Sequence, residues 1–198
     1  MQVLVTGGLG YIGSHTSVLL LEKGYDLVIV DDLSNSNEKV IENISQITNK
    51  VPVFEKIDLK DKESVSKLFN NYDFDGIIHF AAHKSVNESV NYPDKYFKNN
   101  VGSLENIIYE IQKLNKPMNF IFSSSCTVYG QADSMPINEC FELKKAESPY
   151  GQSKRKCEEI LENFHKAGHN FKNITLRYFN PIGAHPTSLI GELPIGIP

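Results

Sequence analysis

The chain has 198 residues, of which 40% are hydrophobic and 22% charged, and its formal net charge is −4. This size suits one soluble domain with a full core, and the chain has no apolar run long enough for a membrane span, no signal-peptide pattern and no basic patch for nucleic acid. Three cysteines, Cys126, Cys140 and Cys157, lack metal-binding spacing, so we expect no metal site and a reducing compartment, the cytoplasm.

The first predicted strand, Gln2–Thr6, runs into a turn with glycines at Gly7, Gly10 and Gly13, and this turn opens a helix predicted over Tyr11–Lys23. Such a turn brings backbone N–H groups and the positive end of a helix dipole against a diphosphate. The glycines would supply a positive φ, a close approach to the pyrophosphate and close helix packing, respectively. The turn therefore predicts a dinucleotide site. A turn that only links two packed elements is the alternative.

The second predicted strand, Leu27–Asp31, ends in two acidic residues, Asp31 and Asp32. Asp31 lies near the offset of about 20 residues at which a carboxylate accepts hydrogen bonds from the adenosine ribose. A carboxylate there repels a 2′-phosphate, and the next cation along the chain is Lys39, so the pattern predicts NAD rather than NADP. Two solvated turn acids are the alternative.

Strands and helices continue to alternate, which implies right-handed crossovers and a parallel sheet. The predicted fold is α/β, a doubly wound parallel sheet of the NAD-binding Rossmann type. We expect strand order 3-2-1-4-5-6, with room for one extra strand and with ligands at the carboxyl ends of the strands. The remaining predicted strands are Val51–Ile57, Gly76–Phe80, Asn119–Ser123 and Asn173–Tyr178, and the remaining predicted helices are Glu38–Thr48, Lys62–Asn70, Pro93–Leu114 and Tyr150–Lys166.

Candidate catalytic groups follow the fifth strand. Tyr150 and Lys154 are four residues apart, so they share one helix face. A nearby cation lowers the pKa of a phenol, and a shift of ~3–4 units requires roughly 4–5 kcal/mol, which Lys154 and the charge of NAD⁺ could supply in a dry site. Ser125 can carry a proton between a substrate hydroxyl and Tyr150. The alternatives are a surface helix with incidental polar groups and a polar loop that caps the strand.

Four segments carry a resemblance to a known family: T-G-G-L-G-Y-I-G, S-S-S-C-T-V-Y-G, S-P-Y-G-Q-S-K and L-R-Y-F-N-P-I-G-A-H. Together they resemble the extended short-chain dehydrogenase/reductases, and within them the UDP-glucose 4-epimerase branch, over the whole chain. Members of that branch are much longer. The resemblance therefore implies an NAD-binding Rossmann domain at residues 1–180 and the start of a truncated substrate-binding region at 181–198, with the C-terminal substrate domain mostly absent.

The resemblance implies an isomerase that interconverts UDP-glucose and UDP-galactose through a transient 4-keto sugar, with NAD as cofactor, in galactose metabolism. Tyr150 would act as the base on the sugar 4′-hydroxyl, Ser125 would bridge that hydroxyl, and Lys154 would hold the ribose and bias the phenol. The full-length protein is expected to form a homodimer. The 198-residue chain alone is expected to keep NAD affinity and to be poorly active.

Further positions match the family's binding residues by motif. Two positions depart from the pattern: His83 stands where many members carry Leu, and Asn87 stands where Gly is usual. Lys84, Ser125, Tyr150 and Asn180 match substrate contacts. Cofactor contacts are matched by Gly7, Gly10, Tyr11, Ile12, Gly13, Asp31, Asp32, Leu33, Asn35, Ser36, Asp58, Leu59, Phe80, Ala81, Ala82, Lys84, Asn99, Tyr150, Lys154 and Phe179.

Three other functions are weighed against an epimerase. Nucleotide-sugar dehydratases carry an Asp-Glu pair after the serine or threonine, where this chain has Cys126 and Thr127. A UDP-glucuronate decarboxylase is a closer relative, whose substrate arginines would partly lie beyond Pro198. A non-catalytic NAD-binding sensor would need the glycine turn, but it would not need Ser125, Tyr150 and Lys154 together. The choice between plain and N-acetylated UDP-hexoses depends on residues beyond Pro198.

Overall fold

The computed structural model describes residues 1–114 and 116–192. Its strands are β1 (Gln2–Thr6), β2 (Asp26–Asp31), β3 (Val53–Lys56), β4 (Gly76–His79), β5 (Met118–Ser125) and β6 (Phe171–Tyr178). They form one sheet in the order β3-β2-β1-β4-β5-β6, and every neighbouring pair is parallel. The predicted fold class and strand order are confirmed, and the described residues add no seventh strand to this sheet.

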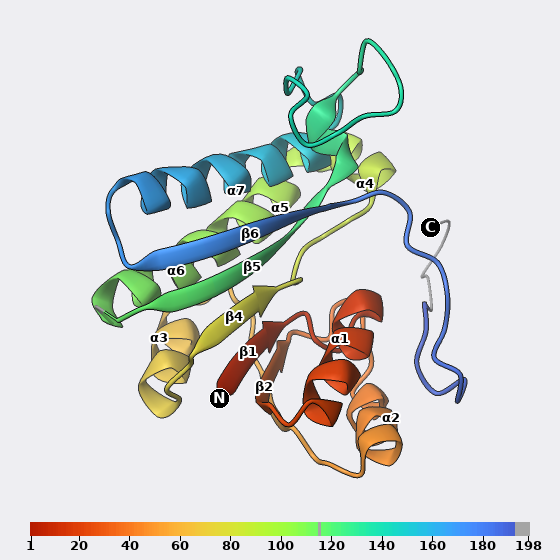
Figure 1. Cartoon of the computed structure of the whole chain (residues 1–198), viewed down its shortest axis with the longest axis vertical. Coiled ribbons are helices and arrows are strands. Elements are labelled where there is room, and N and C mark those ends of the chain that lie inside the picture. Colours follow the sequence, from red (N-terminus) through yellow and green to blue (C-terminus); the bar gives the residue numbers. More distant parts are fainter. Residues whose placement is uncertain (115, 193–198) are drawn as a thin grey trace.

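Helices cover both faces of the sheet (Figure 1). Helices α1 (Tyr11–Glu22) and α2 (Lys39–Thr48) lie on one face, and α3 (Lys62–Asn71), α6 (Gly102–Leu114) and α7 (Pro149–Lys166) lie on the other. Each face of the sheet buries its own apolar cluster against these helices, which is why the central strands are apolar on both sides.

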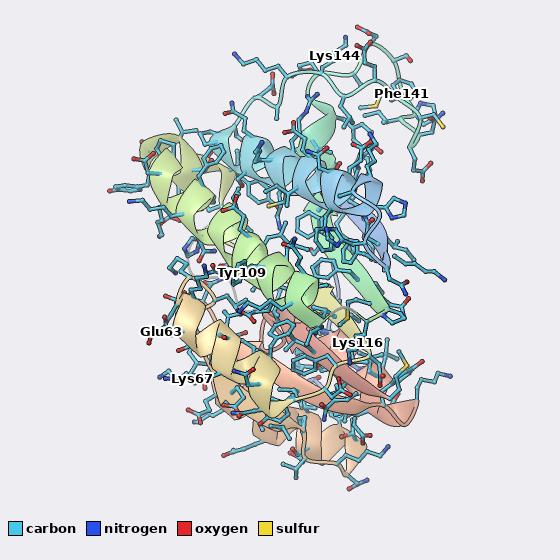
Figure 2. All side chains as sticks on the ribbon, turned by 90° about the vertical axis from the view of Figure 1, so that its left-hand side faces the viewer. Glu63, Lys67, Tyr109, Lys116, Phe141 and Lys144 are labelled. Carbon is cyan, nitrogen blue, oxygen red and sulfur yellow. The ribbon has the colours of Figure 1, made fainter. Side chains whose placement is uncertain are left out.

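The helices on the second face present charged side chains to solvent (Figure 2). Glu63 and Lys67 of α3 are exposed, and so is Tyr109 of α6. The Lys62 ammonium lies 4.0 Å from the centre of the Tyr109 ring and the Lys113 ammonium 4.3 Å from it. These cation–π contacts link α3 to α6 at the surface.

The predicted helical stretch Pro93–Leu114 is confirmed, because the chain is helical from Pro93 to Leu114 without a break. Within it the helix type changes, from α5 (Pro93–Tyr96) through a π-turn over Phe97–Val101 to α6. The π-turn buries Asn99 and Asn100, and the Asn100 amide bonds to groups outside its own helix. Periodicity does not reveal this change of helix type, because the apolar pattern continues through it.

Two short elements were not predicted at all: helix α4 (Val86–Asn91) and the 3₁₀ turn Cys126–Tyr129. Ser85 caps α4 by accepting a hydrogen bond from Glu88 N, and Ser125 accepts one from Thr127 N at the 3₁₀ turn. Within residues 1–114 and 116–192, no helix combines the length and the apolar character that a membrane crossing requires.

After β6 the chain runs past the carboxyl ends of the strands and down beside α1 and α2 (Figure 1). Asn43 Nδ2 donates to Leu189 O at 2.8 Å, and Ile190 is buried against the apolar cluster beneath α1 and α2. This segment therefore packs onto the Rossmann domain as far as the structure describes it. Residues 193–198 of the predicted substrate-binding region lie outside the described residues.

Candidate cofactor and catalytic site

The glycine turn, called the cradle below, packs so closely that Gly7 and Gly13 have no room for a Cβ. Gly7 has the positive φ that its position predicted, 64°, and a Cβ there would lie 2.6 Å from Ala81 N. A Cβ on Gly13 would lie 2.2 Å from Gly7 O. No side chain in the described part of the chain caps α1, and its first turn holds no acidic residue. The positive end of this helix is therefore available to an anion, as a diphosphate requires.

Asp31 joins the glycine turn to the loop after β2. Its carboxylate accepts from Leu9 N at 3.1 Å, from Leu33 N at 3.1 Å and from Ser36 Oγ at 2.7 Å. A carboxylate offers about four acceptor positions, so capacity for one further donor, such as a ribose hydroxyl, remains. Asp32 is engaged separately, because its Oδ1 accepts from Ser34 N at 2.9 Å.

A second group of predicted cofactor residues lies after β3, after β4 and in the π-turn. Lys60 Nζ lies 3.0 Å from Asp58 Oδ1 and 3.1 Å from Asn99 Oδ1, so one lysine joins two of the predicted residues. Leu59 is buried beside them. Phe80, Ala81 and Ala82 follow β4, where the Ala81 backbone closes against Gly7.

The remaining predicted binding residues are Lys84, Phe179 and Asn180. Lys84 Nζ forms an ion pair with Glu192 Oε1 at 2.6 Å. Asn180 is exposed, and Phe179 is 58% exposed. Phe179 lines a cavity of about 510 Å³ at the end of β6, together with Tyr129 and Arg177. None of the three candidate catalytic residues lines that cavity, so it is separate from the catalytic cluster.

Tyr150 and Lys154 lie one helical turn apart near the start of α7, and Ser125 lies at the end of β5. Ser148 caps α7 by accepting from Gly151 N, and this places Tyr150 in the first helical turn. The buried Lys154 ammonium donates to Ser123 O at 2.7 Å. Ser125 ends β5, and its hydroxyl lies close enough to the Tyr150 phenol to act on the pKa of that phenol. A phenol, a hydroxyl and an ammonium therefore meet at the carboxyl edge of the sheet.

The pKa of Tyr150 differs from the expectation. Burial raises it above the ordinary value, and the hydrogen bond from Ser125 acts in the opposite direction. Burial also lowers the pKa of Lys154 to about 8, against the raising effects of Cys157 and Glu158. The lowered phenol pKa expected from the Tyr150–Lys154 spacing is therefore not a property of the chain by itself. A further positive charge is needed.

Several residues of the site carried no sequence signal. The Asn100 amide accepts from His83 N at 2.8 Å and donates to His83 O at 3.1 Å and to Ser153 Oγ at 3.0 Å. It thereby joins the loop before Lys84 to the helix of Tyr150. His83, a departure from the family pattern, packs on the buried ring of Tyr96 at 5.6 Å between centroids.

Residues 4–190 match the family model described as "GDP-mannose 4,6 dehydratase". UDP-glucose 4-epimerase uge1 of Schizosaccharomyces pombe is 46% identical over 99% of this chain and 56% of its own length. The UDP-glucose 4-epimerase of Bacillus subtilis is 46% identical over 100% of this chain and 58% of its own. The chain thus spans less than two thirds of the length of these relatives.

The solved structures agree with the curated relatives. The crystal structure of UDP-glucose 4-epimerase from Bifidobacterium longum in complex with NAD⁺ and UDP superimposes with a TM-score of 0.96 at 42% identity. The match covers 100% of this chain and 59% of that one. The similarity therefore extends through the cradle and the catalytic cluster.

Proposed function

The chain belongs to the GDP-mannose 4,6 dehydratase family, and from this premise we propose that it is the NAD-binding part of a UDP-glucose 4-epimerase. One observation carries the proposal: the Tyr150 phenol, the Ser125 hydroxyl and the Lys154 ammonium meet at the strand ends that also hold the glycine cradle. Relatives named UDP-glucose 4-epimerase match the whole chain and support the same conclusion.

The residues present fit NAD. The cradle at Gly7 and Gly13 has no room for a Cβ, and the uncapped start of α1 faces it. Asp31 retains acceptor capacity for a ribose hydroxyl and leaves the site unfavourable for a 2′-phosphate. Asp58 and Asn99 would hold the adenine and nicotinamide portions, respectively. Bound NAD⁺ would supply a reversible hydride acceptor and a positive charge beside the phenol.

The chain's own residues would manage the proton. Tyr150 takes the proton of the sugar 4′-hydroxyl as that carbon becomes a ketone, and it returns the proton when the carbon is reduced from its other face. Ser125, which lies beside the phenol, relays the proton and holds the sugar oxygen. Lys154 stabilises the phenolate by its charge. Because one group both removes and restores the proton, the arrangement suits an epimerisation with no net redox change.

A dehydratase is less well supported, although the family model bears that name. Water loss needs an acid and a base beside the tyrosine. The two residues after Ser125 are Cys126 and Thr127, and the Thr127 hydroxyl donates to Ser125 Oγ at 3.0 Å. Neither side chain is a carboxylate. We also infer that the complete protein acts in the cytoplasm as a homodimer on UDP-glucose and UDP-galactose, with Lys84 and Asn180 contacting the sugar nucleotide.

The proposal is tested with Tyr150→Phe in the complete gene product. We expect kcat for interconversion of UDP-glucose and UDP-galactose to fall roughly 10²–10⁴-fold, because the general base is lost. NAD affinity and the thermal midpoint should stay close to those of the unmutated protein. The 198-residue chain should bind NAD and turn over little. An unmutated gene product that binds no NAD, or a Tyr150→Phe variant with normal kcat, contradicts the proposal.

A further inference from the structure

A carboxylate that the predicted site did not include lies one helical turn beyond Lys154. Glu158 extends from α7, and its side chain is 12% exposed. It forms a two-point ion pair with Arg177 of β6, with Arg177 Nε 3.1 Å from Oε1 and Nη2 2.8 Å from Oε2. Ser124 Oγ of β5 also donates to Oε1, at 2.5 Å. Three elements therefore meet at this one carboxylate.

We infer that Glu158 is a positioning residue for the Tyr150–Lys154 pair, because its carboxylate holds the end of β5 against α7 and places a negative charge beside the Lys154 ammonium. The inference deepens the proposed function and rests on it for the role of Tyr150.

The contacts between β5 and α7 follow a regular order. Tyr150, Lys154 and Glu158 are spaced by four, so they lie on one face of α7 over two turns. The last three residues of β5 each lie against one of them: Ser125 Oγ lies beside the Tyr150 phenol, Ser123 O accepts from Lys154, and Ser124 Oγ donates to Glu158. Loss of the third contact would loosen the segment that carries the other two.

Arg177 holds Glu158 in this position. Arg177 is paired with Ser124 in the β5–β6 register, so it reaches Glu158 from the strand beside the serine. Its guanidinium lies 4.8 Å from the centre of the Tyr129 ring, and Glu158 raises the pKa of Arg177 further above its ordinary value. A planar guanidinium that binds both carboxylate oxygens leaves that carboxylate a single orientation.

The groups around Lys154 indicate which charge stabilises its protonated form. The titratable groups that face it are Cys157 and Glu158 of α7 and His79 of β4, with Arg177 of β6 beyond Glu158 and Glu105 of α6 behind Cys157. Burial raises the pKa of Cys157 to about 12 and lowers that of His79 to about 3, so both are neutral near pH 8. Glu158 is then the anion that keeps Lys154 protonated as its pKa of about 8 is approached.

The decisive readout is the ionisation of Lys154 itself, measured in the 198-residue chain without substrate. It is followed by NMR of protein with ¹³C-labelled lysine, and the Lys154 signal is assigned as the one that the same protein carrying Lys154→Met lacks. In Glu158→Gln the anion beside the ammonium is lost, so Lys154 should lose its proton about one pH unit lower than in the unmutated chain. A purely structural defect would expose the ammonium and shift its ionisation in the opposite direction, because burial is what lowers the Lys154 pKa.

Two further variants complete the experiment. Glu159→Gln changes the exposed neighbour, which pairs only with Lys156 among the described ion pairs, and it should titrate like the unmutated chain. Glu158→Gln combined with Arg177→Met removes both charges, so no half-buried arginine is left unpaired if the single variant folds poorly. The double variant should show a smaller downward shift of the Lys154 pKa, because the positive charge of Arg177 is removed together with the anion.

Kinetics of the complete gene product give an independent readout. In Glu158→Gln the alkaline limb of kcat should move to lower pH with little change in KM, whereas Glu159→Gln should keep the original profile. An unchanged Lys154 titration, or an upward shift, in both Glu158 variants overturns the inference. A folded, unmutated protein that fails to interconvert the UDP-hexoses overturns the proposed function instead, and the Lys154 titration then still tests Glu158.

Discussion

At Gly13 one methyl group decides whether the first turn of α1 can lie against the cradle. A Cβ there would lie 2.2 Å from Gly7 O and 2.8 Å from Gly8 Cα, and neither backbone atom can move aside easily. Gly13→Ala should therefore lower the free energy of unfolding by about 1–3 kcal/mol and weaken NAD binding at least tenfold. Chemical denaturation and a fluorescence titration with NAD would measure the two effects.

Gly102 provides the matched control for that substitution. It has helical angles, φ −62° and ψ −37°, and nothing lies within 4 Å of the position of a Cβ. Gly102→Ala should stabilise the protein by about 0.5–1 kcal/mol, because alanine loses less backbone entropy in a helix. NAD affinity should stay unchanged. If both alanine variants bind NAD normally, the cradle does not have the role assigned to it.

At the scale of single elements, α7 matters most to the site, because it carries Tyr150, Lys154 and Glu158 on one face. Its start depends on Ser148, whose side chain accepts from Gly151 N at 3.1 Å. Ser148→Ala should cost about 1 kcal/mol of stability. It should also lower kcat of the complete protein, because Tyr150 lies in the turn that frays. Thermal melting and steady-state kinetics would measure the two changes.

The control for this cap is Asp61, which caps α3 on the outer side of the same layer by accepting from Glu63 N. Asp61→Ala should lower stability without changing kcat, since α3 supplies no candidate catalytic residue. Equal losses of kcat in the two cap variants would show that helix fraying, wherever it occurs, disturbs the site. The specific role assigned to the start of α7 would then be wrong.

For the whole molecule, the buried His79 predicts how stability depends on pH. Its Nδ1 lies 2.7 Å from Thr6 Oγ1, its Nε2 has no partner among the described residues, and burial lowers its pKa to about 3. The unfolded chain binds a proton at this histidine below about pH 6.5, and the folded protein does not until about pH 3. Stability from this group is therefore complete above about pH 6.5 and decreases as the pH falls, by up to about 1.4 kcal/mol per pH unit.

The comparison of His79→Leu with the unmutated chain isolates that contribution. Carboxylates also titrate in this range, but they do so equally in both proteins. Denaturant unfolding at pH 7 and pH 5 should give a smaller loss of stability for the variant than for the unmutated chain. The same loss in both proteins would mean that His79 does not remain neutral in the folded state.

Features that depend on the order of the elements along the chain, or on residue spacing within one element, could be predicted from the sequence. Strand–helix alternation predicted the sheet order, because parallel strands need right-handed crossovers. The glycine spacing predicted the turn with positive φ at Gly7, since only glycine adopts that angle without strain. The helical period placed Tyr150 and Lys154 on one face.

Which distant groups complete the site follows from tertiary packing alone. Asn100 meets Ser153 across 53 residues, Lys84 meets Glu192 across 108, and Asn100 lies in a π-turn within a helical run whose sequence pattern shows no change. The direction of the Tyr150 pKa was also decided there, because burial outweighs any single neighbour. The physical reason is the same in each case: desolvation and long-range partners depend on how all the elements pack, and no short window of sequence contains that information.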